Sequence, residues 1–385
     1  GNDGTADGYK GIAPDARLVS VKVGASNGAT DVSQMIAGID WVTQHAHDDG
    51  MNIRVLNLSL GTNAVQPYQL DPLAHAAEQA WKHGIVVVVA VGNDGTATPN
   101  VANPASDPYL LAVGAEDPMG TVSSDDDVVA PFSQRGTGYR HADVVAPGTY
   151  VMGLLSPGSF LANAYPAAVL GNRFLRGSGT SQATAVVSGV VADLLSARPG
   201  LTPDQVKAIL TLSATRIATT KANFVGSGLV QLPAALGMPM PGWVRQFWPA
   251  SDGGGSLEQA RGTSHVSTGG VALTGEQDIF GHAWNSAAIA ALENSASAWN
   301  GGVFNGSTWS GSTWSGSTWS GSTWSGSTWS GSTWSGSTWS GSTWSGSTWS
   351  GSTWSGSTWS GSTWSGSTWT GSAWSGNDWL GATWT

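Results

Sequence analysis

The sequence has no cysteine among its 385 residues, which excludes disulfide and thiolate chemistry and leaves the redox compartment open. Charge is also scarce. Only 10% of the residues are charged, and the net charge of −10 provides no basic surface for a nucleic acid. Long apolar runs are missing as well, because the longest, residues 85–92, is far shorter than the roughly 20 residues of a membrane helix. We therefore expect no nucleic-acid partner and no membrane span, and we interpret the run as a buried strand.

Residues 1–237 alternate strand patterns with helix patterns, which predicts an α/β domain with a mainly parallel sheet. Strands are expected at residues 16–23, 54–61 and 85–93. Helices are expected from Asp31, which forms a capping box with Gln34, and from Asp71, which is followed by Pro72. Further helices are expected behind Ser181 and after Thr202.

The remaining chain changes composition twice. Residues 238–298 are rich in Pro, Gly and Ala and weakly patterned, which predicts a linker. A repeat tail occupies residues 299–385, in which residues 306–365 are twelve identical GSTWS units. Its composition is compatible with an irregular extended segment, and its period with a β-solenoid of five residues per side. Exposed Trp side chains could also contact glycans or cell-wall material, which is the weakest of the three interpretations.

The stretch "RGSGTSQATAVVSG", residues 176–189, surrounds the hydroxyl of Ser181 with small residues at the start of an apolar helix. A serine nucleophile needs an adjacent base and donors aimed at the developing oxyanion, and a helix N-terminus favours negative charge. Small neighbours would let a peptide approach. The alternative is that Ser181 or Thr180 only caps the helix. This stretch by itself leaves both alternatives open.

Seven segments in order along residues 1–237 resemble the subtilisin-like serine peptidases, the subtilases. The segments are "KGIAPDARLVSVKV", "NLSLG", "VAVGNDG", "LLAVGAED", "PFSQRG", "DVVAPG" and "GTSQATA", and "GSGLVQLPAAL" resembles the close of that domain. The resemblance implies a subtilisin-like parallel sheet flanked by helices. It makes Ser181 the nucleophile, Asn93 the oxyanion-hole donor beside the Ser181 N–H, and Ser59, Leu60 and Gly61 the edge that pairs with an extended substrate. Gln182 and Ala185 depart from the family motif, in which Met and Pro stand.

The family's catalytic Asp and His motifs do not occur in this sequence. In subtilases the chain order is Asp, His, Ser, and the His motif would come just before the matched region. His45, His47, His75 and His83 fall on predicted amphipathic helices, where we expect solvated imidazoles. We expect the base and its carboxylate to lie upstream, and this fragment, which lacks the N-terminal part of the sheet, to be inactive.

These observations predict part of a secreted, extracellular serine endopeptidase that hydrolyses polypeptide substrates through an acyl-enzyme. The alternative is a non-catalytic surface or adhesion protein that displays the Trp repeats. No cofactor is expected. Asp3 and Asp7 lie where relatives often have a calcium-binding loop, but a flexible loop is the simpler interpretation, and we predict no metal.

Overall fold

The computed structural model describes residues 9–25, 27–217, 225–239, 242, 244–268, 270–300 and 302–308, and the backbone of five strands in the repeat tail. The chain divides into two compact units, Gly1–Trp299 and Asn300–Thr385, which we describe separately. Within the described ranges, none of the helices combines the length and the apolar character that a membrane crossing requires.

The sheet of the first unit is built mainly from parallel strands. Its members are β1 (Val55–Leu58), β2 (Val86–Ala90), β3 (Leu111–Asp117) and β5 (Val144–Pro147), with the short β4 (Val128–Val129) antiparallel to β3. All five residues of β2 are buried. This burial fits a central parallel strand with both faces covered, and it explains the unbroken apolar run in the sequence.

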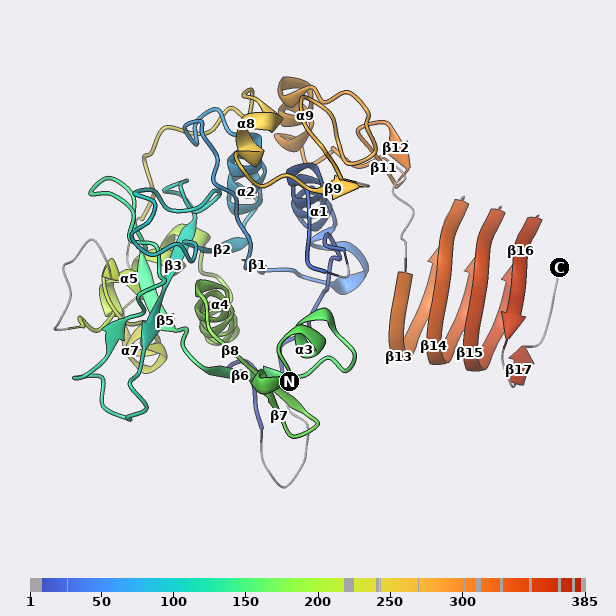
Figure 1. Ribbon diagram of the computed structural model, residues 1–385, viewed down its shortest axis with the longest axis horizontal. Coiled ribbons are helices and arrows are strands. Elements are labelled where there is room, and N and C mark those ends of the chain that lie inside the picture. The colour runs from blue at the N-terminus through green and yellow to red at the C-terminus, as the bar shows by residue number, and fades with distance from the viewer. Residues whose placement is uncertain are drawn as a thin grey trace. The chain divides into compact units, whose positions relative to one another are not determined.

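Helices cover this sheet as the sequence predicts. The 18-residue α4 (Thr180–Ala197) contacts β1, β2, β3 and β5, while α2 (Pro72–Lys82) and α5 (Pro203–Ser213) contact β2. In Figure 1, α2 and α4 lie on opposite sides of β1 and β2. A fourth helix, α1 (Val32–His45), packs on α2 and carries the predicted capping box of Asp31 and Gln34. The α/β prediction for this region is confirmed.

A small antiparallel sheet leads the chain into α4. It consists of β6 (Val151–Leu154), β7 (Val169–Leu170) and β8 (Phe174–Gly177), with the helices α3 (Phe160–Ala164) and η2 (Pro166–Ala168) between β6 and β7. Another short helix, η1 (Asp48–Gly50), follows α1. Only Ser178 and Gly179 separate the end of β8 from the start of α4. Ser181 therefore follows closely after the end of a strand.

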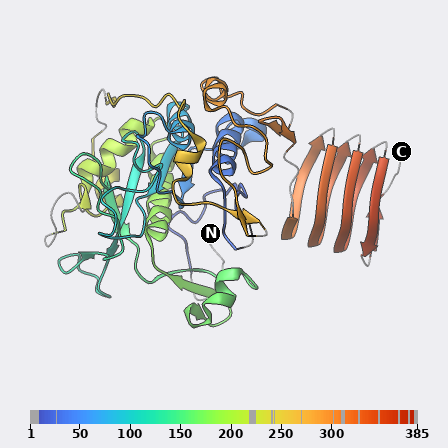
Figure 2. The same ribbon diagram turned by 45° about the horizontal axis from the view of Figure 1, so that its top comes forward.

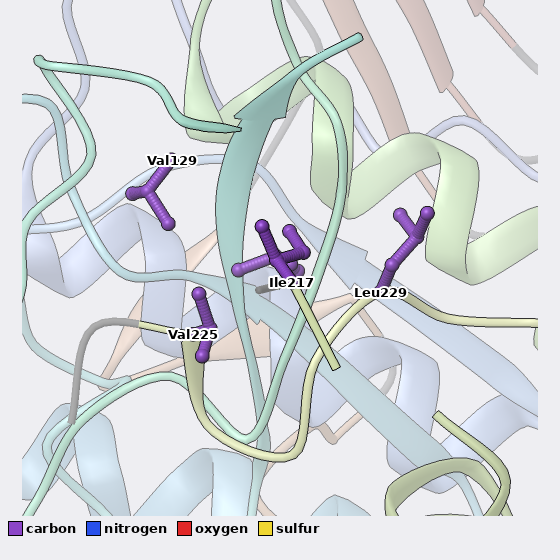
Figure 3. Packing of buried hydrophobic residues seen from close by; sticks show 5 residues of the cluster. Val129, Ile217, Val225 and Leu229 are labelled. Carbon is purple, nitrogen blue, oxygen red and sulfur yellow. The ribbon is translucent and has the colours of Figure 1, made fainter. Parts of the chain in front are cut away.

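The end of the family-like region closes over the far edge of the sheet. Leu229 forms a parallel bridge with Val145 and an antiparallel bridge with Thr215, before α7 (Leu232–Gly237) begins. A small apolar core fills this closure (Figure 3), and its members are Val129, Val145, Ile217, Val225 and Leu229. The bridges and this core fix the C-terminal end of the domain to β5.

The strand predicted at residues 16–23 is not formed in the structure. Leu18 is 88% exposed and Val19 is 45% exposed, and no described strand pairs with this segment. Backbone pairing needs a neighbouring strand, which explains why a strand-like sequence remains irregular here. The apolar pattern is real, but its partner is not among the described residues.

The linker predicted at residues 238–298 differs from the structure, because from residue 244 onward it packs as part of the first unit. This part contains α8 (Leu257–Arg261), α9 (Ser286–Glu293) and the small ladder of β9 (Ser267–Thr268) with β10 (Val271–Ala272). Figures 1 and 2 both show α8 and α9 beside α1 and α2, and these helices are in contact. We call residues 244–299 the extension.

Polar groups anchor the extension, which explains why an apolar pattern did not reveal it. Arg261 is fully buried, and its guanidinium donates to Asp31 Oδ2 at 2.6 Å and to the carbonyl oxygens of Gly275 and Gln277. Trp299, which the sequence assigned to the tail, donates from Nε1 to Ala37 O at 2.9 Å and lies in the first unit.

The second unit contains the repeats. After the hairpin of β11 (Val303–Phe304) and β12 (Ser307–Thr308), the parallel strands are β13 (Thr313–Ser325), β14 (Thr328–Ser345), β15 (Thr348–Ser365), β16 (Thr368–Ser375) and β17 (Asp378–Gly381). Residues that pair between neighbouring strands lie twenty positions apart, as Trp314 and Trp334 do. Twenty residues are four pentapeptides, the spacing that five residues per side of a solenoid would require, and the solenoid stays a prediction.

Candidate active site

Ser181 lies in the first turn of α4, and its hydroxyl does not cap the helix. The N-cap residue is Gly179, which provides no side-chain cap. Ser181 Oγ instead donates to Ser59 O at 3.1 Å, and Ser59 Oγ donates to Ser181 O at 2.9 Å. The capping alternative for Ser181 is therefore wrong. The sequence-predicted nucleophile and the first residue of the predicted substrate edge lie in direct contact.

Close packing around the start of α4 depends on glycine. A Cβ on Gly179 would lie 2.7 Å from Gln182 Oε1, and a Cβ on Gly177 would lie 2.8 Å from Gln182 Nε2. Gln182, which stands where the family has Met, therefore folds back over the two glycines that precede Ser181. A larger residue at either glycine would displace the side-chain amide of Gln182 from this position.

Asn93 follows β2 at the carboxyl edge of the sheet, and the structure brings it to the start of α4. Its Oδ1 accepts from Thr180 N at 2.8 Å and from Thr180 Oγ1 at 3.0 Å. A backbone N–H can only donate, so these bonds identify the oxygen of the amide and leave Nδ2 as the free donor. Thr180 thereby orients Asn93.

Gly92 makes the turn into Asn93 possible. Its φ is +104°, and a Cβ there would lie 1.6 Å from Gln134 Oε1. Only glycine satisfies both conditions. Sequence reasoning found Asn93 through its motif but missed Thr180 and Gln134. The sequence did contain a signal for Thr180. A hydroxyl directly before the predicted nucleophile can position a neighbouring side chain as well as cap a helix.

The predicted substrate edge remains accessible. Ser59 and Leu60 are half-buried and Gly61 is exposed. A Cβ on Gly61 would lie 2.9 Å from Asn103 O, so this edge runs close against the neighbouring segment. Thr62 then forms a two-bond bridge with Asn103. Asn93 and the Ser59–Gly61 edge thus both contact the start of α4, and the roles of these residues stay predictions.

No imidazole in the described part of the chain is hydrogen-bonded to Ser181 Oγ. The partners of the histidine rings lie elsewhere: Trp41 O for His45, Ser251 O for His75, Gln79 O for His83, Ala142 O for His141, and Glu258 for His265. His282 faces Asp278 at 3.9 Å. Among the described residues, the site therefore contains the predicted nucleophile and the predicted oxyanion donor but no histidine in position to act as a base.

The prediction of a solvated imidazole is wrong for His75. Its side chain is 2% exposed, its Nδ1 lies 2.8 Å from Ser251 O, and its Nε2 lies 3.5 Å from Glu293 Oε2. Burial lowers the pKa of His75 from its usual value. The extension covers this face of α2, so the wrong prediction for His75 follows from the wrong prediction of a linker.

Within the described ranges, no group of three or more His, Asp or Glu side chains could hold a metal ion. Asp3 and Asp7 lie outside the described residues. The acidic run at residues 125–127 is only partly solvated, because Asp125 and Asp126 are exposed whereas Asp127 is buried.

The comparisons with known proteins concern the N-terminal part of the chain. The model of the subtilase family, Peptidase S8, matches residues 1–228. This chain belongs to the subtilase family. The match ends directly before Leu229, a member of the closing core, so the extension and the repeat tail lie outside the matched region.

Two curated subtilases illustrate the relationship. The chain is 38% identical over 228 residues to serine protease AprX of Bacillus subtilis (strain 168), a match that covers 58% of this chain and 52% of AprX. It is 34% identical over 228 residues to subtilisin Savinase of Lederbergia lenta, which covers 59% of this chain and 71% of Savinase. The chain therefore spans only about half the length of AprX.

Among solved structures, the crystal structure of fervidolysin from Fervidobacterium pennivorans, a keratinolytic enzyme related to subtilisin, shares 31% identity with this chain. The superposition has a TM-score of 0.43 and covers 55% of this chain and 29% of fervidolysin.

Proposed function

We propose that this subtilase chain provides the nucleophile, the oxyanion hole and the substrate edge of a serine endopeptidase. The observation that carries the proposal is the orientation of Asn93, whose Oδ1 accepts two hydrogen bonds from Thr180, the residue before Ser181, so that Nδ2 remains as the donor of the amide. An amide held in this way is a preorganised donor, which is what an oxyanion hole requires. Family membership and the names of the relatives support the same activity.

The proposed reaction proceeds in two balanced halves. Ser181 Oγ attacks the scissile carbonyl carbon while its proton passes to a base, and the carbonyl oxygen becomes an oxyanion held by the Ser181 N–H and Asn93 Nδ2. The oxyanion then collapses, the C–N bond breaks, and the protonated base donates its proton to the leaving amine. Water repeats the sequence on the acyl-enzyme, which releases the acid and restores Ser181.

The base must come from outside the described residues. A serine hydroxyl is a weak nucleophile without an adjacent base, and no described imidazole reaches Ser181. The exposed apolar side chains of Leu18 and Val19 support a further segment that pairs with residues 16–23. In subtilases a segment bearing the Asp and His motifs would supply both the base and a neighbouring strand.

The proposed substrate is an extended polypeptide that adds to the edge formed by Ser59, Leu60 and Gly61. Main-chain hydrogen bonds along such an edge bind many sequences, and side-chain pockets select among them. An extracellular location is proposed because the relatives include subtilisins such as Savinase. Nothing in the comparisons favours the adhesion alternative or contact of the tail with a cell wall.

For the repeat tail we propose the solenoid. The parallel ladder with its 20-residue register supports it. If the strands were straight, the residues between two strands would be too few to reach from the end of one strand to the start of the next. Thr333 pairs beside Thr313, yet only eight residue steps, at most about 28 Å, separate it from Ser325 at the other end of β13. A straight strand of that length would place it about 40 Å away, so the chain has to bend around. Blue-shifted Trp emission would support the solenoid, and water-like emission would contradict it.

Casein hydrolysis tests the proposed activity. The chain would be joined to the segment of a subtilase that bears the Asp and His motifs, and we call this product the reconstituted enzyme. We expect it to cleave casein, Ser181→Ala to abolish cleavage, and Ser188→Ala, a matched change on the same helix, to leave it within about twofold of the unsubstituted enzyme. A Ser181→Ala variant that still cleaves casein would overturn the proposal.

A further inference from the structure

The segment that follows the substrate edge contacts the extension, which lies outside the region matched by the family model. The edge residues Ser59–Gly61 continue into Thr62, whose side chain is 2% exposed. Thr62 Oγ1 donates to Ala260 O, in α8, at 2.6 Å. Three residues further along, Val65 N donates to Gln259 O at 3.0 Å. The segment that follows the substrate edge therefore lies directly on α8.

These contacts belong to a closed ring of hydrogen bonds. Thr62 and Asn103 exchange two backbone bonds of 2.9 Å, and Asn103 Nδ2 donates to Asp71 Oδ1 at 3.0 Å. Gln66 Nε2 then donates to Asp71 Oδ2 at 2.9 Å and to Ser256 O at 2.8 Å. Ser256 is the N-cap of α8, and α8 returns to Thr62 through Ala260.

Most of this ring is shielded from water. Asp71 and Asn103 are 1% and 3% exposed, and Ala260 is fully buried. Buried hydrogen-bonded networks of this kind favour one arrangement, because breaking any member leaves another polar group unsatisfied. The ring therefore fixes the position of Thr62 and, across from it, of Asn103, whose carbonyl oxygen lies against Gly61.

The end of α8 packs closely against residues 62–64, which follow the substrate edge. Gly262, at the end of α8, has a φ of +58°, and a Cβ there would lie 2.0 Å from Asn63 O. The helix is held in turn by Arg261, which is fully buried and bonded to Asp31. A shift of α8 must therefore displace residues 62–64.

We propose that α8 acts as a buttress of the substrate edge, with Thr62 and Gly262 as positioning residues for polypeptide binding. This inference rests on the proposed endopeptidase function and deepens it. Productive binding along an edge requires the backbone to be held within fractions of an ångström, and rigid second elements provide that support. Loss of the buttress should weaken substrate binding and leave the chemistry at Ser181 nearly unchanged.

Two measurements on matched variants test the buttress. Thr62→Val removes the donor to Ala260 O with little change in shape, Thr62→Ser keeps the hydroxyl, and Gly262→Ala forces α8 away from Asn63. The control is Thr43→Val, which removes a comparable buried bond, from Thr43 Oγ1 to Ile39 O at 2.9 Å, within α1. Each variant would be made in the full chain and in the reconstituted enzyme.

In the full chain, we expect Thr62→Val and Gly262→Ala to speed amide hydrogen exchange at residues 59–62 and 103 at least tenfold, and the other two variants to leave it unchanged. In the reconstituted enzyme, the same two variants should raise KM about tenfold with kcat within twofold, and Thr62→Ser should restore KM. A loss of kcat with unchanged KM, or equal effects of Thr62→Val and Thr43→Val on KM and on amide exchange, would overturn the inference that α8 supports the substrate edge.

The exchange measurement separates this inference from the proposed function. If exchange speeds up as expected but the unsubstituted reconstituted enzyme cleaves nothing, the proposed function fails and the coupling of α8 to the edge stands. If the enzyme cleaves casein but Thr62→Val leaves the rate of amide exchange at residues 59–62 unchanged, the inference about α8 is wrong and the proposed function stands.

Discussion

The substitution Arg261→Met tests whether the extension is an integral part of the first unit. Arg261 and Asp31 are both fully buried and form an ion pair of 2.6 Å. The guanidinium also satisfies the carbonyl oxygens of Gly275 and Gln277, at 2.6 and 2.5 Å. Methionine would retain most of the apolar stem but would leave a buried carboxylate and two carbonyl oxygens without these donors.

The expected loss of stability is large. Removing one member of a buried ion pair costs about 3 to 5 kcal/mol, out of about 5 to 15 kcal/mol for a folded domain. At roughly 2 to 4 °C per kcal/mol, the Tm should fall by about 6 to 20 °C. Urea denaturation followed by far-UV circular dichroism would measure the free energy, and a thermal scan would measure the Tm.

Two further variants make the test specific. Arg17→Met removes an exposed arginine that donates to Gly50 O and Met51 O, and it should cost less than about 1 kcal/mol. Asp31→Asn keeps a good N-cap for α1 while it removes the charge. The double variant with Arg261→Met should lose about 0.5 to 3 kcal/mol less than the sum of the single variants. An Arg261→Met variant as stable as Arg17→Met would show that the extension is a linker after all.

Three further predictions concern the site and the pH dependence of stability. Asn93→Leu should lower kcat of the reconstituted enzyme by about 10²–10³, a magnitude known for an oxyanion-hole Asn of a subtilisin in this same family. Thr180→Val should lower kcat about tenfold in the same casein assay, because one of the two bonds that orient Asn93 is lost. Burial, with Asp127 and Asp117, raises the pKa of Glu116 to about 7, so the folded state retains a proton that the unfolded chain releases. The free energy of unfolding should therefore fall by about 3 kcal/mol between pH 4.5 and 7. Urea titrations of Glu116→Gln at a series of pH values should lack this decrease.

Much of the first unit could be predicted from sequence because its signals are local. The capping box at Asp31, the Asp71–Pro72 start of α2 and the unbroken apolar run of β2 each depend on neighbours in the chain. The approach of Asn93 to the start of α4 could be expected only from the family resemblance. It depends on the sheet topology, which places the end of β2 at the start of α4.

The extension could not be predicted because its anchors are polar and distant in sequence. Arg261 pairs with Asp31 across 230 positions, and Ser251 N donates to Glu78 across 173 positions. Neither contact produces an apolar period, and the intervening glycines and prolines resemble those of a linker. The failed strand at residues 16–23 is the opposite case, in which the local pattern is present and the partner is not among the described residues.

Covalent labelling of the reconstituted enzyme tests the central claim most directly. A fluorophosphonate reacts when an activated serine oxygen attacks phosphorus and displaces fluoride, and mass spectrometry of the digest identifies the modified residue. The account predicts a single adduct on Ser181, its loss in Ser181→Ala, and its retention in Ser188→Ala. An adduct on another serine, or no adduct on an enzyme that cleaves casein, would contradict the assignment of Ser181 as the nucleophile.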